Sequence, residues 1–368
     1  MKKESPKNLP AVQSRPESPV ISTEQLLGDI RSLIEGARGQ VAQAVNAGLV
    51  LLHWQIGERI RKDILQKERA EYGKEVVAAL SQQLTVEYGR GFTRDALFRM
   101  VQFVERFPDS KIVATLSRQL GWSHFVELIA IEGTLNREFY AEMCRIALWS
   151  VRSLRAKIQG MLYERTGISK KPDELAKEEL KRLREEDRLT PDLVFRDPYL
   201  LDFLGLKDTY GEKDLEAAIL HELEHFLVEL GSDFAFLARQ RRIAVDQEDY
   251  YIDLLFYHRR LHRLVAIDLK LGHFQAADKG QMELYLRWLE KHEKQAGEDP
   301  PIGLILCADK SAEHVELLQL EKSGIRVAQY LTELPPRKVL EHKLHEAIRV
   351  AREQLATRQL PPPARGTG

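Results

Sequence analysis

The spacing of apolar residues along the chain changes once, near Pro191. From Glu24 to about Leu162, apolar residues recur three and four positions apart, which is the spacing of amphipathic helices. The clearest runs are LVLLHWQIGERI, VVAALSQQL, ALFRMVQFVERF, SHFVELIAIE and REFYAEMCRIAL. Glycines fall between these runs and indicate helix ends and turns. The pattern predicts a helical N-terminal region.

After Pro191, short apolar runs typical of strands alternate with helical patterns. We expect a helix at about 212–230, three strands near 234–245, 250–258 and 263–271, a helix at 278–293, a strand at IGLILCA, a helix at 311–321, a strand at IRVAQYL and a charged terminal helix. Three adjacent strands after one helix, followed by strand–helix–strand, indicate a mixed sheet flanked by helices. The predicted fold class is therefore a helical domain followed by an α/β domain.

These changes of pattern predict five segments. Residues 21–162 form a helical domain that binds nucleic acid or a partner, and residues 191–345 form the α/β domain. Residues 163–190 are dominated by charge and predict a solvated linking helix, so we expect a separate core on each side of it. Residues 1–20 form a Pro- and Ser-rich disordered tail, and residues 346–368 contain the end of the terminal helix and a second such tail.

Composition is that of an ordinary globular protein, with 43% hydrophobic and 30% charged residues. The net charge of −1 gives no global basic field for nucleic acid, although a local patch would suffice. Cys144 and Cys307 are too few for a disulfide framework or a Cys-based zinc site. The N-terminus lacks the apolar region of a secretory signal, and no run reaches the roughly 20 apolar residues of a membrane span. We therefore expect a cytoplasmic protein without a membrane partner.

Two of the expected strands carry charged residues among apolar ones. IDLLFY contains Asp253, and VAIDLKLG contains Asp268 and Lys270. A carboxylate in an apolar strand is costly unless its charge is compensated. Side chains two apart on a strand share a face at a spacing of roughly 6.6 Å, so Asp268 and Lys270 point the same way. If the two strands pair as a hairpin, Asp253 meets them.

The helix expected at about 212–230 supplies a third acid. On a helical wheel, Glu216 falls inside the apolar stripe, between Leu223 and Leu227. Gln281 likewise lies on the apolar side of the helix after the strands. Convergent carboxylates without a His/Cys cluster suit Mg²⁺ or Mn²⁺ better than zinc. A lysine beside such an ion can stabilise charge on a phosphate, so these parts favour phosphodiester hydrolysis.

An acid on a helix, Asp on a strand, Asp-x-Lys on the next strand and Gln on the following helix form an order that resembles the PD-(D/E)xK nuclease superfamily. The resemblance is closer to one bacterial branch, the YhcG-like family. The blocks similar to its nuclease domain are DPYLLDFLGL, FAFLARQRRI, YYIDLLFYHRRLHRLVAIDLKLG, GQMELYL and PIGLILC. YGKEVVAALSQQLTVEYGRGFTRDALFRMVQF and WSVRSLRAKIQ are similar to its helical N-terminal domain. Together they cover nearly everything between about residues 24 and 345.

This resemblance implies a restriction-endonuclease-like fold and a Mg²⁺-dependent (or Mn²⁺-dependent) endonuclease, a hydrolase acting on nucleic acid. DNA is favoured over RNA as the substrate, and the choice between them stays open. It implies Glu216, Asp253 and Asp268 as metal ligands that also take part in catalysis, Lys270 as the catalytic lysine and Gln281 as an accessory residue. Position 268 is Asp where that branch more usually has Glu, and the superfamily uses both. Whether the chain forms a homo-oligomer stays open.

The N-terminal region also contains the pattern of a helix-turn-helix. A helix ends at Tyr88, two glycines form a turn, and Thr93 caps a second helix that carries Arg94 and Arg99. Such a helix could lie in a groove of nucleic acid. An ordinary helical hairpin with solvated arginines fits the same pattern.

Other interpretations stay open. Arg239 and Arg241, on the strand before the acidic site, could approach phosphates or could act as edge charges that prevent aggregation. HELEH, from His221 to His225, fits a zinc-peptidase motif, but the wheel places both histidines opposite the apolar stripe. The chain could also be an inactive nucleic-acid-binding or scaffold protein that keeps the nuclease fold.

Overall fold

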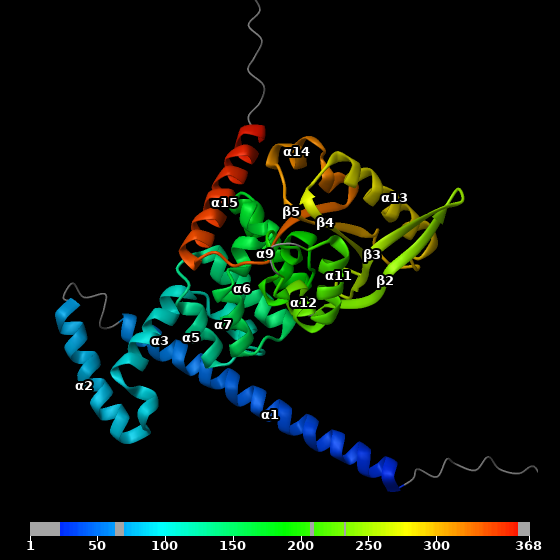
Figure 1. Ribbon diagram of the computed structural model, residues 1–368. Coiled ribbons are helices and arrows are strands. Elements are labelled where there is room, and N and C mark those ends of the chain that lie inside the picture. Colours follow the sequence, from blue (N-terminus) through cyan, green and yellow to red (C-terminus); the bar gives the residue numbers. More distant parts are fainter. Residues whose placement is uncertain (1–22, 63–69, 207–209, 232, 360–368) are drawn as a thin grey trace, which may run out of the picture.

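Helices form the N-terminal half of the chain, and a six-stranded mixed sheet with flanking helices forms the C-terminal half, as expected (Figure 1). The computed structural model describes residues 23–62, 70–206, 210–231 and 233–359. The tail expected at 1–20 lies outside the described residues, as does the end of the tail expected after 346. Within the described ranges, no helix is both long and apolar enough to cross a bilayer.

The N-terminal helices are α1 (Thr23–Ile60), α2 (Ala70–Tyr88), α3 (Arg94–Arg106), α4 (Ser110–Leu116), α5 (Trp122–Ile129), α6 (Thr134–Ala147) and α7 (Val151–Gln159). Helices α3, α4 and α5 pack against the C-terminal half of α1, whose other half extends away from the bundle (Figure 1), while α2 packs against α3, and α6 and α7 pack against α5. Helices α1 and α3 cross so closely at Gly57 that a Cβ there would lie 2.0 Å from the carbonyl oxygen of Met100. Only glycine fits at this crossing.

The helix-turn-helix pattern is confirmed at its helix ends and its cap. Helix α2 ends at Tyr88, and a single 3₁₀ turn (Arg90–Phe92) follows. The Thr93 hydroxyl accepts a hydrogen bond from the backbone N–H of Ala96 at 3.4 Å and caps α3. Buried apolar residues on α3 then face α1 and α5.

The segment between the two halves differs from expectation. It contains α8 (Leu162–Arg165), α9 (Asp173–Glu186) and α10 (Pro191–Val194). Helix α9 is not solvated all round, because Ala176, Leu180 and Leu183 are fully buried. These positions follow helical spacing, so a narrow apolar stripe decides the packing although charges dominate the composition. The expectation of two separate cores is wrong, since one apolar cluster continues from the N-terminal helices through α9 into the sheet.

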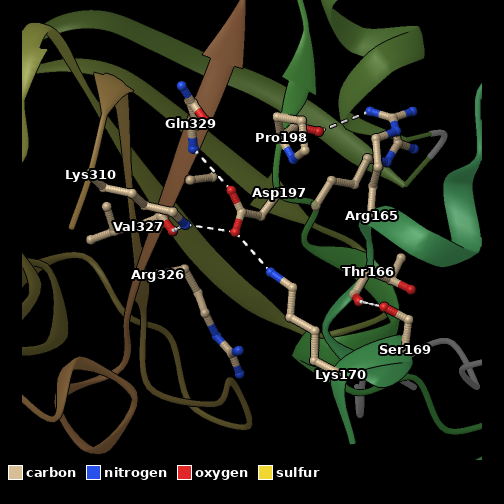
Figure 2. A network of polar contacts seen from close by, with 12 residues as sticks. Arg165, Thr166, Ser169, Lys170, Asp197, Pro198, Lys310, Arg326, Val327 and Gln329 are labelled. Atoms are coloured by element: carbon tan, nitrogen blue, oxygen red, sulfur yellow. Dashed lines mark hydrogen bonds and ion pairs between the residues drawn. The ribbon is translucent and has the colours of Figure 1, made fainter. Parts of the chain in front are cut away.

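Figure 2 shows how this segment is joined to the sheet through Asp197. One carboxylate oxygen accepts hydrogen bonds from Lys170 at 2.8 Å and from Lys310 at 2.6 Å. The other accepts from the backbone N–H of Gln329 at 3.1 Å. Burial alone would raise the pKa of Asp197, but the two lysines outweigh it and hold that pKa well below its usual range.

The sheet has the strand order β1-β6-β5-β4-β3-β2. Its strands are β1 (Tyr199–Leu200), β2 (Phe234–Val245), β3 (Glu248–His258), β4 (Arg263–His273), β5 (Ile302–Asp309) and β6 (Ile325–Leu331). Strands β1, β6, β5 and β4 run parallel to one another, and β4, β3 and β2 form an antiparallel meander. The pattern of apolar runs predicts every one of these strands except the two-residue β1.

Helices cover both faces of the sheet. The remaining helices are α11 (Glu212–His221), α12 (Leu223–Leu230), α13 (Ala276–His292), α14 (Ala312–Leu317) and α15 (Arg337–Gln359). Met282, Tyr285 and Leu289 of α13 belong to one apolar cluster, and α11 and α12 contribute to the other. The single helix expected at 212–230 is two helices, because the backbone leaves helical geometry at Glu222 (φ −101°, ψ 32°).

Candidate active site

Strands β3 and β4 separate at the point where the two aspartates lie. Their ladder runs from the pair His258–Arg263 to the pair Leu254–Ile267. One residue further, the Asp253 carboxylate accepts a hydrogen bond from the backbone N–H of Leu269 at 2.8 Å. The side chain of Asp253 thus replaces a backbone partner, and β4 continues beside β5 alone. We call this point of separation, between Asp253 of β3 and Leu269 of β4, the fork. It holds the Asp253 carboxylate between the two strands.

Glu216 of α11 reaches the same fork. The Gln240 amide nitrogen on β2 donates to Glu216 Oε2 at 2.8 Å and to Asp253 Oδ1 at 3.0 Å. Two oxygens that share one donor at these lengths lie no more than about 6 Å apart. Arg239 Nε donates to the other oxygen of Glu216 at 2.6 Å. Glu216 is only 5% exposed, so this buried acid is partnered on both oxygens.

Asp268 and Lys270 lie on the same face of β4, as the spacing predicts. Lys270 Nζ forms an ion pair with Asp268 Oδ2 at 2.9 Å, although the angles do not fit a hydrogen bond. The same nitrogen lies 4.0 Å from Asp278 Oδ1. Burial raises the pKa of Asp268 to about 7, with Asp253 adding to the rise and Lys270 opposing it. Burial lowers the pKa of Lys270, but Asp268 and Asp278 outweigh it and raise that pKa overall.

Asp253 responds to the same environment. Burial raises its pKa and the Glu216 carboxylate adds to the rise, while the hydrogen bonds from Leu269 and Gln240 oppose it. Three acids therefore share a poorly solvated region with Lys270 and Arg239 as the nearby cationic groups. Such a region favours the binding of an additional cation.

The donor set fits a hard divalent cation, because carboxylate oxygens are its preferred ligands. As positioned, however, the described residues contain no group of three or more His, Cys, Asp or Glu side chains that could hold one metal ion. Between Glu216 and Asp253 lies the Gln240 amide, and Asp268 is paired with Lys270. The assignment of Glu216, Asp253 and Asp268 as ligands of one ion stays a prediction.

Gln281 contacts Tyr285 on the same helix and has no hydrogen bond to the three acids among the described contacts. Its amide nitrogen donates to the Tyr285 hydroxyl at 2.5 Å, and that hydroxyl donates to the carbonyl of Tyr251 at 2.9 Å. Burial raises the pKa of Tyr285, and Asp268 and Asp253 add to the rise, so the phenol lies within the electrostatic reach of the site. The accessory role of Gln281 is untested and stays a prediction.

Sequence reasoning did not identify Gln240 or Asp278 as parts of this site. Asp278 accepts a hydrogen bond from the backbone N–H of Gln275 at 2.8 Å, so the sequence marks it as an ordinary helix cap. Gln240 occupies a left-handed backbone conformation inside a strand (φ 45°). A sequence pattern does not predict a left-handed backbone at a glutamine within a strand.

The four arginines proposed to bind nucleic acid have different surroundings. Arg94 and Arg99 are exposed on α3, and the Arg94 guanidinium lies 5.7 Å from the centre of the Phe98 ring. On β2, Arg239 is paired with Glu216, and Arg241 is paired with Glu293. The α3 arginines are therefore better placed than the β2 arginines to contact a partner.

The zinc-peptidase interpretation of HELEH does not fit the structure. That motif needs both histidines on one continuous helix facing a buried ion. Here the helix is interrupted at Glu222, and the side chains of His221 and His225 are 86% and 63% exposed. His225 Nδ1 lies 2.8 Å from Glu222 Oε2, so the residue that would act as base is instead paired with a histidine.

Comparisons with known proteins match both halves of the chain. Residues 29–165 match the DUF1016 N-terminal domain, and residues 192–345 match the YhcG PDDEXK nuclease domain. Over 365 residues the chain is 35% identical to the Escherichia coli (strain K12) protein named "Putative nuclease YhcG", covering 90% of this chain and 96% of that protein.

Two solved structures also match, each over 35% of this chain. A repair endonuclease from Pyrococcus abyssi is 17% identical over 50% of its length, and EndoMS in its apo form is 18% identical over 49% of its length. Both have a TM-score of 0.24. The identity to the Escherichia coli protein over nearly the full length of both chains carries the assignment: this chain belongs to the YhcG family, which joins a DUF1016 N-terminal domain to a PDDEXK nuclease domain.

Proposed function

We propose that this protein is a divalent-metal-dependent endonuclease that hydrolyses phosphodiester bonds of DNA, with Mg²⁺ or Mn²⁺ as its cofactor. The observation that carries the proposal is the fork between β3 and β4. There the buried Asp268, paired with the half-buried Lys270, lies next to Asp253, which is linked to Glu216 through one amide group. Two buried free cysteines, Cys144 and Cys307, suit the reducing cytoplasm.

Glu216, Asp253 and Asp268 are the residues that would hold the cation. When bound, a divalent cation polarises the phosphate and lowers the pKa of water that attacks it. The protein fixes Asp253 through the backbone N–H of Leu269 and fixes Asp268 within β4. Preorganised groups of this kind are what electrostatic catalysis requires.

Lys270 supplies positive charge beside the scissile phosphate. Asp268 and Asp278 raise its pKa, so the ammonium stays protonated at neutral pH. A protonated lysine stabilises negative charge that develops on phosphate oxygens and cannot act as a general base. We therefore assign Lys270 to charge stabilisation.

The helix-turn-helix would hold the substrate. Arg94 and Arg99 are exposed on α3, and contacts to phosphates need only exposed cationic side chains. In this proposal the N-terminal domain binds the DNA backbone, and the fork between β3 and β4 cleaves it.

Incubation of the purified protein with labelled DNA and RNA, in Mg²⁺, Mn²⁺ or EDTA, tests the proposal. We expect cleavage of DNA in either metal and none in EDTA. Asp253→Asn should reduce cleavage about 10²–10⁴-fold, as loss of a positioned charged group does. Asp246→Asn is the matched control, because Asp246 is exposed in the β2–β3 turn away from the acids.

Cleavage that persists in EDTA, or that survives Asp253→Asn as well as Asp246→Asn, would contradict the proposal. DNA binding without cleavage under any metal condition would favour the inactive, nucleic-acid-binding alternative. Preferential cleavage of RNA would keep the site and change the substrate.

A further inference from the structure

We propose that Gln240 is a positioning residue whose amide group occupies the place of the cation between Glu216 and Asp253 in the metal-free protein, and that this amide moves away when a divalent ion binds. The inference rests on the proposed metal-dependent function and adds a residue that neither the motif nor the family resemblance assigns. It concerns the protein before metal is bound.

The Gln240 amide makes contacts with both carboxylates that a bound cation would make. Its single amide nitrogen donates one hydrogen to Glu216 Oε2 at 2.8 Å and the other to Asp253 Oδ1 at 3.0 Å. A primary amide has two donor hydrogens, so both are used on carboxylates from two different elements. The nitrogen has no lone pair to offer a metal ion. A cation that binds both acids must therefore displace it.

The backbone at Gln240 is unusual for the centre of a strand. Its φ of 45° lies in the left-handed region, which is costly for a residue with a side chain. Every other non-glycine residue with positive φ in the described ranges lies at a helix end or in a turn. Alternation of exposure also breaks here, since Arg241 and Arg242 are both exposed and Ile243 is buried.

A costly conformation persists only where its surroundings determine it, and such residues gather at functional sites. For Gln240, these surroundings include the two acids that its amide contacts. Without an amide donor, two carboxylates less than about 6 Å apart in a poorly solvated region repel each other. The amide therefore stabilises the metal-free fork and competes with the ion for the same oxygens.

Calorimetric titration of the full-length protein with Mn²⁺ tests this competition. Gln240→Asn tolerates the left-handed backbone but is one methylene shorter, so it cannot bridge both acids. We expect it to bind Mn²⁺ about tenfold more tightly than the wild type, because two competing charge-assisted hydrogen bonds are lost. Gln247→Asn is the matched control, since Gln247 has φ 71° in the exposed β2–β3 turn; its Mn²⁺ affinity should be unchanged.

Thermal unfolding gives a second measurement. In EDTA, Gln240→Asn should unfold at a lower temperature than the wild type; in saturating Mn²⁺ the two midpoints should converge. Gln240→Gly, which accepts the backbone conformation without strain, should show the same gain in Mn²⁺ affinity if the asparagine variant folds poorly.

An unchanged or weaker Mn²⁺ affinity in both Gln240 variants, while the wild type binds Mn²⁺ and cleaves DNA, would overturn the inference and leave the proposed function intact. If the wild type itself binds no Mn²⁺, or if Asp253→Asn does not affect binding, the proposed metal site fails, and the role of Gln240 fails with it. The two results are therefore distinct.

Discussion

Lys270 is the residue whose role depends most on its neighbours. It lies 2.9 Å from Asp268 and is half-buried, so its charge is held near the fork and is not free to move into solvent. A residue of this kind can contribute to charge stabilisation without contributing a metal ligand. Charge stabilisation and metal binding can be measured separately in a variant that removes the charge of Lys270 and keeps a side chain of similar length.

Lys270→Met should leave Mn²⁺ binding intact or slightly improved, because one repelling cation is lost. Cleavage should fall about 10²–10⁴-fold. Calorimetry and a cleavage assay on the same preparation check both parts. Lys291→Met, at an exposed position in the last turn of α13, is the control and should change neither. If Lys270→Met cleaved like the wild type, the assignment of charge stabilisation would be wrong.

Among the secondary-structure elements, the apolar pattern predicts β2 to β6 closely and fails where packing is not periodic. Strand β1 has only two residues, and its pairing with β6 comes from the distant end of the domain. The break at Glu222 is not visible as glycine or proline, and Leu223 and Leu227 continue the helical stripe beyond it. Periodicity measures burial along an element and does not show where its backbone bends.

The same distinction applies to the candidate site. Asp253, Asp268 and Lys270 could be placed from strand spacing, because side chains two apart share a face and hairpin strands are adjacent. Gln240 could not be placed, since its approach to the acids needs a left-handed backbone that sequence pattern does not predict. Arg239 and Glu216 are 23 residues apart in the sequence, so their pairing depends on how α11 and β2 pack together and cannot be predicted from local spacing.

Helix α3 is the element on which the proposed DNA binding depends. Replacing both Arg94 and Arg99 by alanine should weaken DNA binding and reduce the slope of log affinity against log salt by about 2, since each phosphate contact contributes roughly 0.9. Fluorescence anisotropy at several salt concentrations measures this slope. Arg182→Ala, on the exposed side of α9, should leave it unchanged. An unchanged slope in the double variant would exclude these two arginines as phosphate contacts.

For the whole molecule, the junction is the feature that composition predicts least well. Charges dominate residues 163–190, yet α9 buries three apolar side chains, and Asp197 joins the segment to β6. The family matches end at residue 165 and resume at 192, so the junction falls between them. The domain boundaries themselves stay a prediction, but the continuous core indicates that the two halves are packed together.

Asp197 makes the stability of this junction depend on pH. Its pKa is held below the unfolded value, so its contribution is fully present above about pH 4 and is lost as the pH falls below that value. Asp197→Asn should therefore lower the free energy of unfolding by about 2 kcal/mol at pH 7, less than a fully buried pair because the lysines are partly exposed. At pH 2 the difference between the variant and the wild type should be smaller than at pH 7, because the contribution of Asp197 falls as the pH approaches its folded pKa.

Urea unfolding at both pH values measures these differences. Asp299→Asn is a control of the same kind, because its partner Arg263 lies at a more exposed ion pair outside the junction. A destabilisation by Asp197→Asn that is equal at pH 7 and pH 2 would show that packing, and not the charge of Asp197, stabilises the junction.

The proposed metal site requires Glu216, Asp253 and Asp268 to converge on one divalent ion at the fork between β3 and β4. Anomalous diffraction from crystals of the full-length protein grown with Mn²⁺ tests it most directly. We expect a manganese peak in contact with carboxylate oxygens of these three residues, with the Gln240 amide turned away from the space between Glu216 and Asp253. A peak bound only by other residues, or no peak at the fork while the Gln240 amide still bridges the two acids, would contradict it.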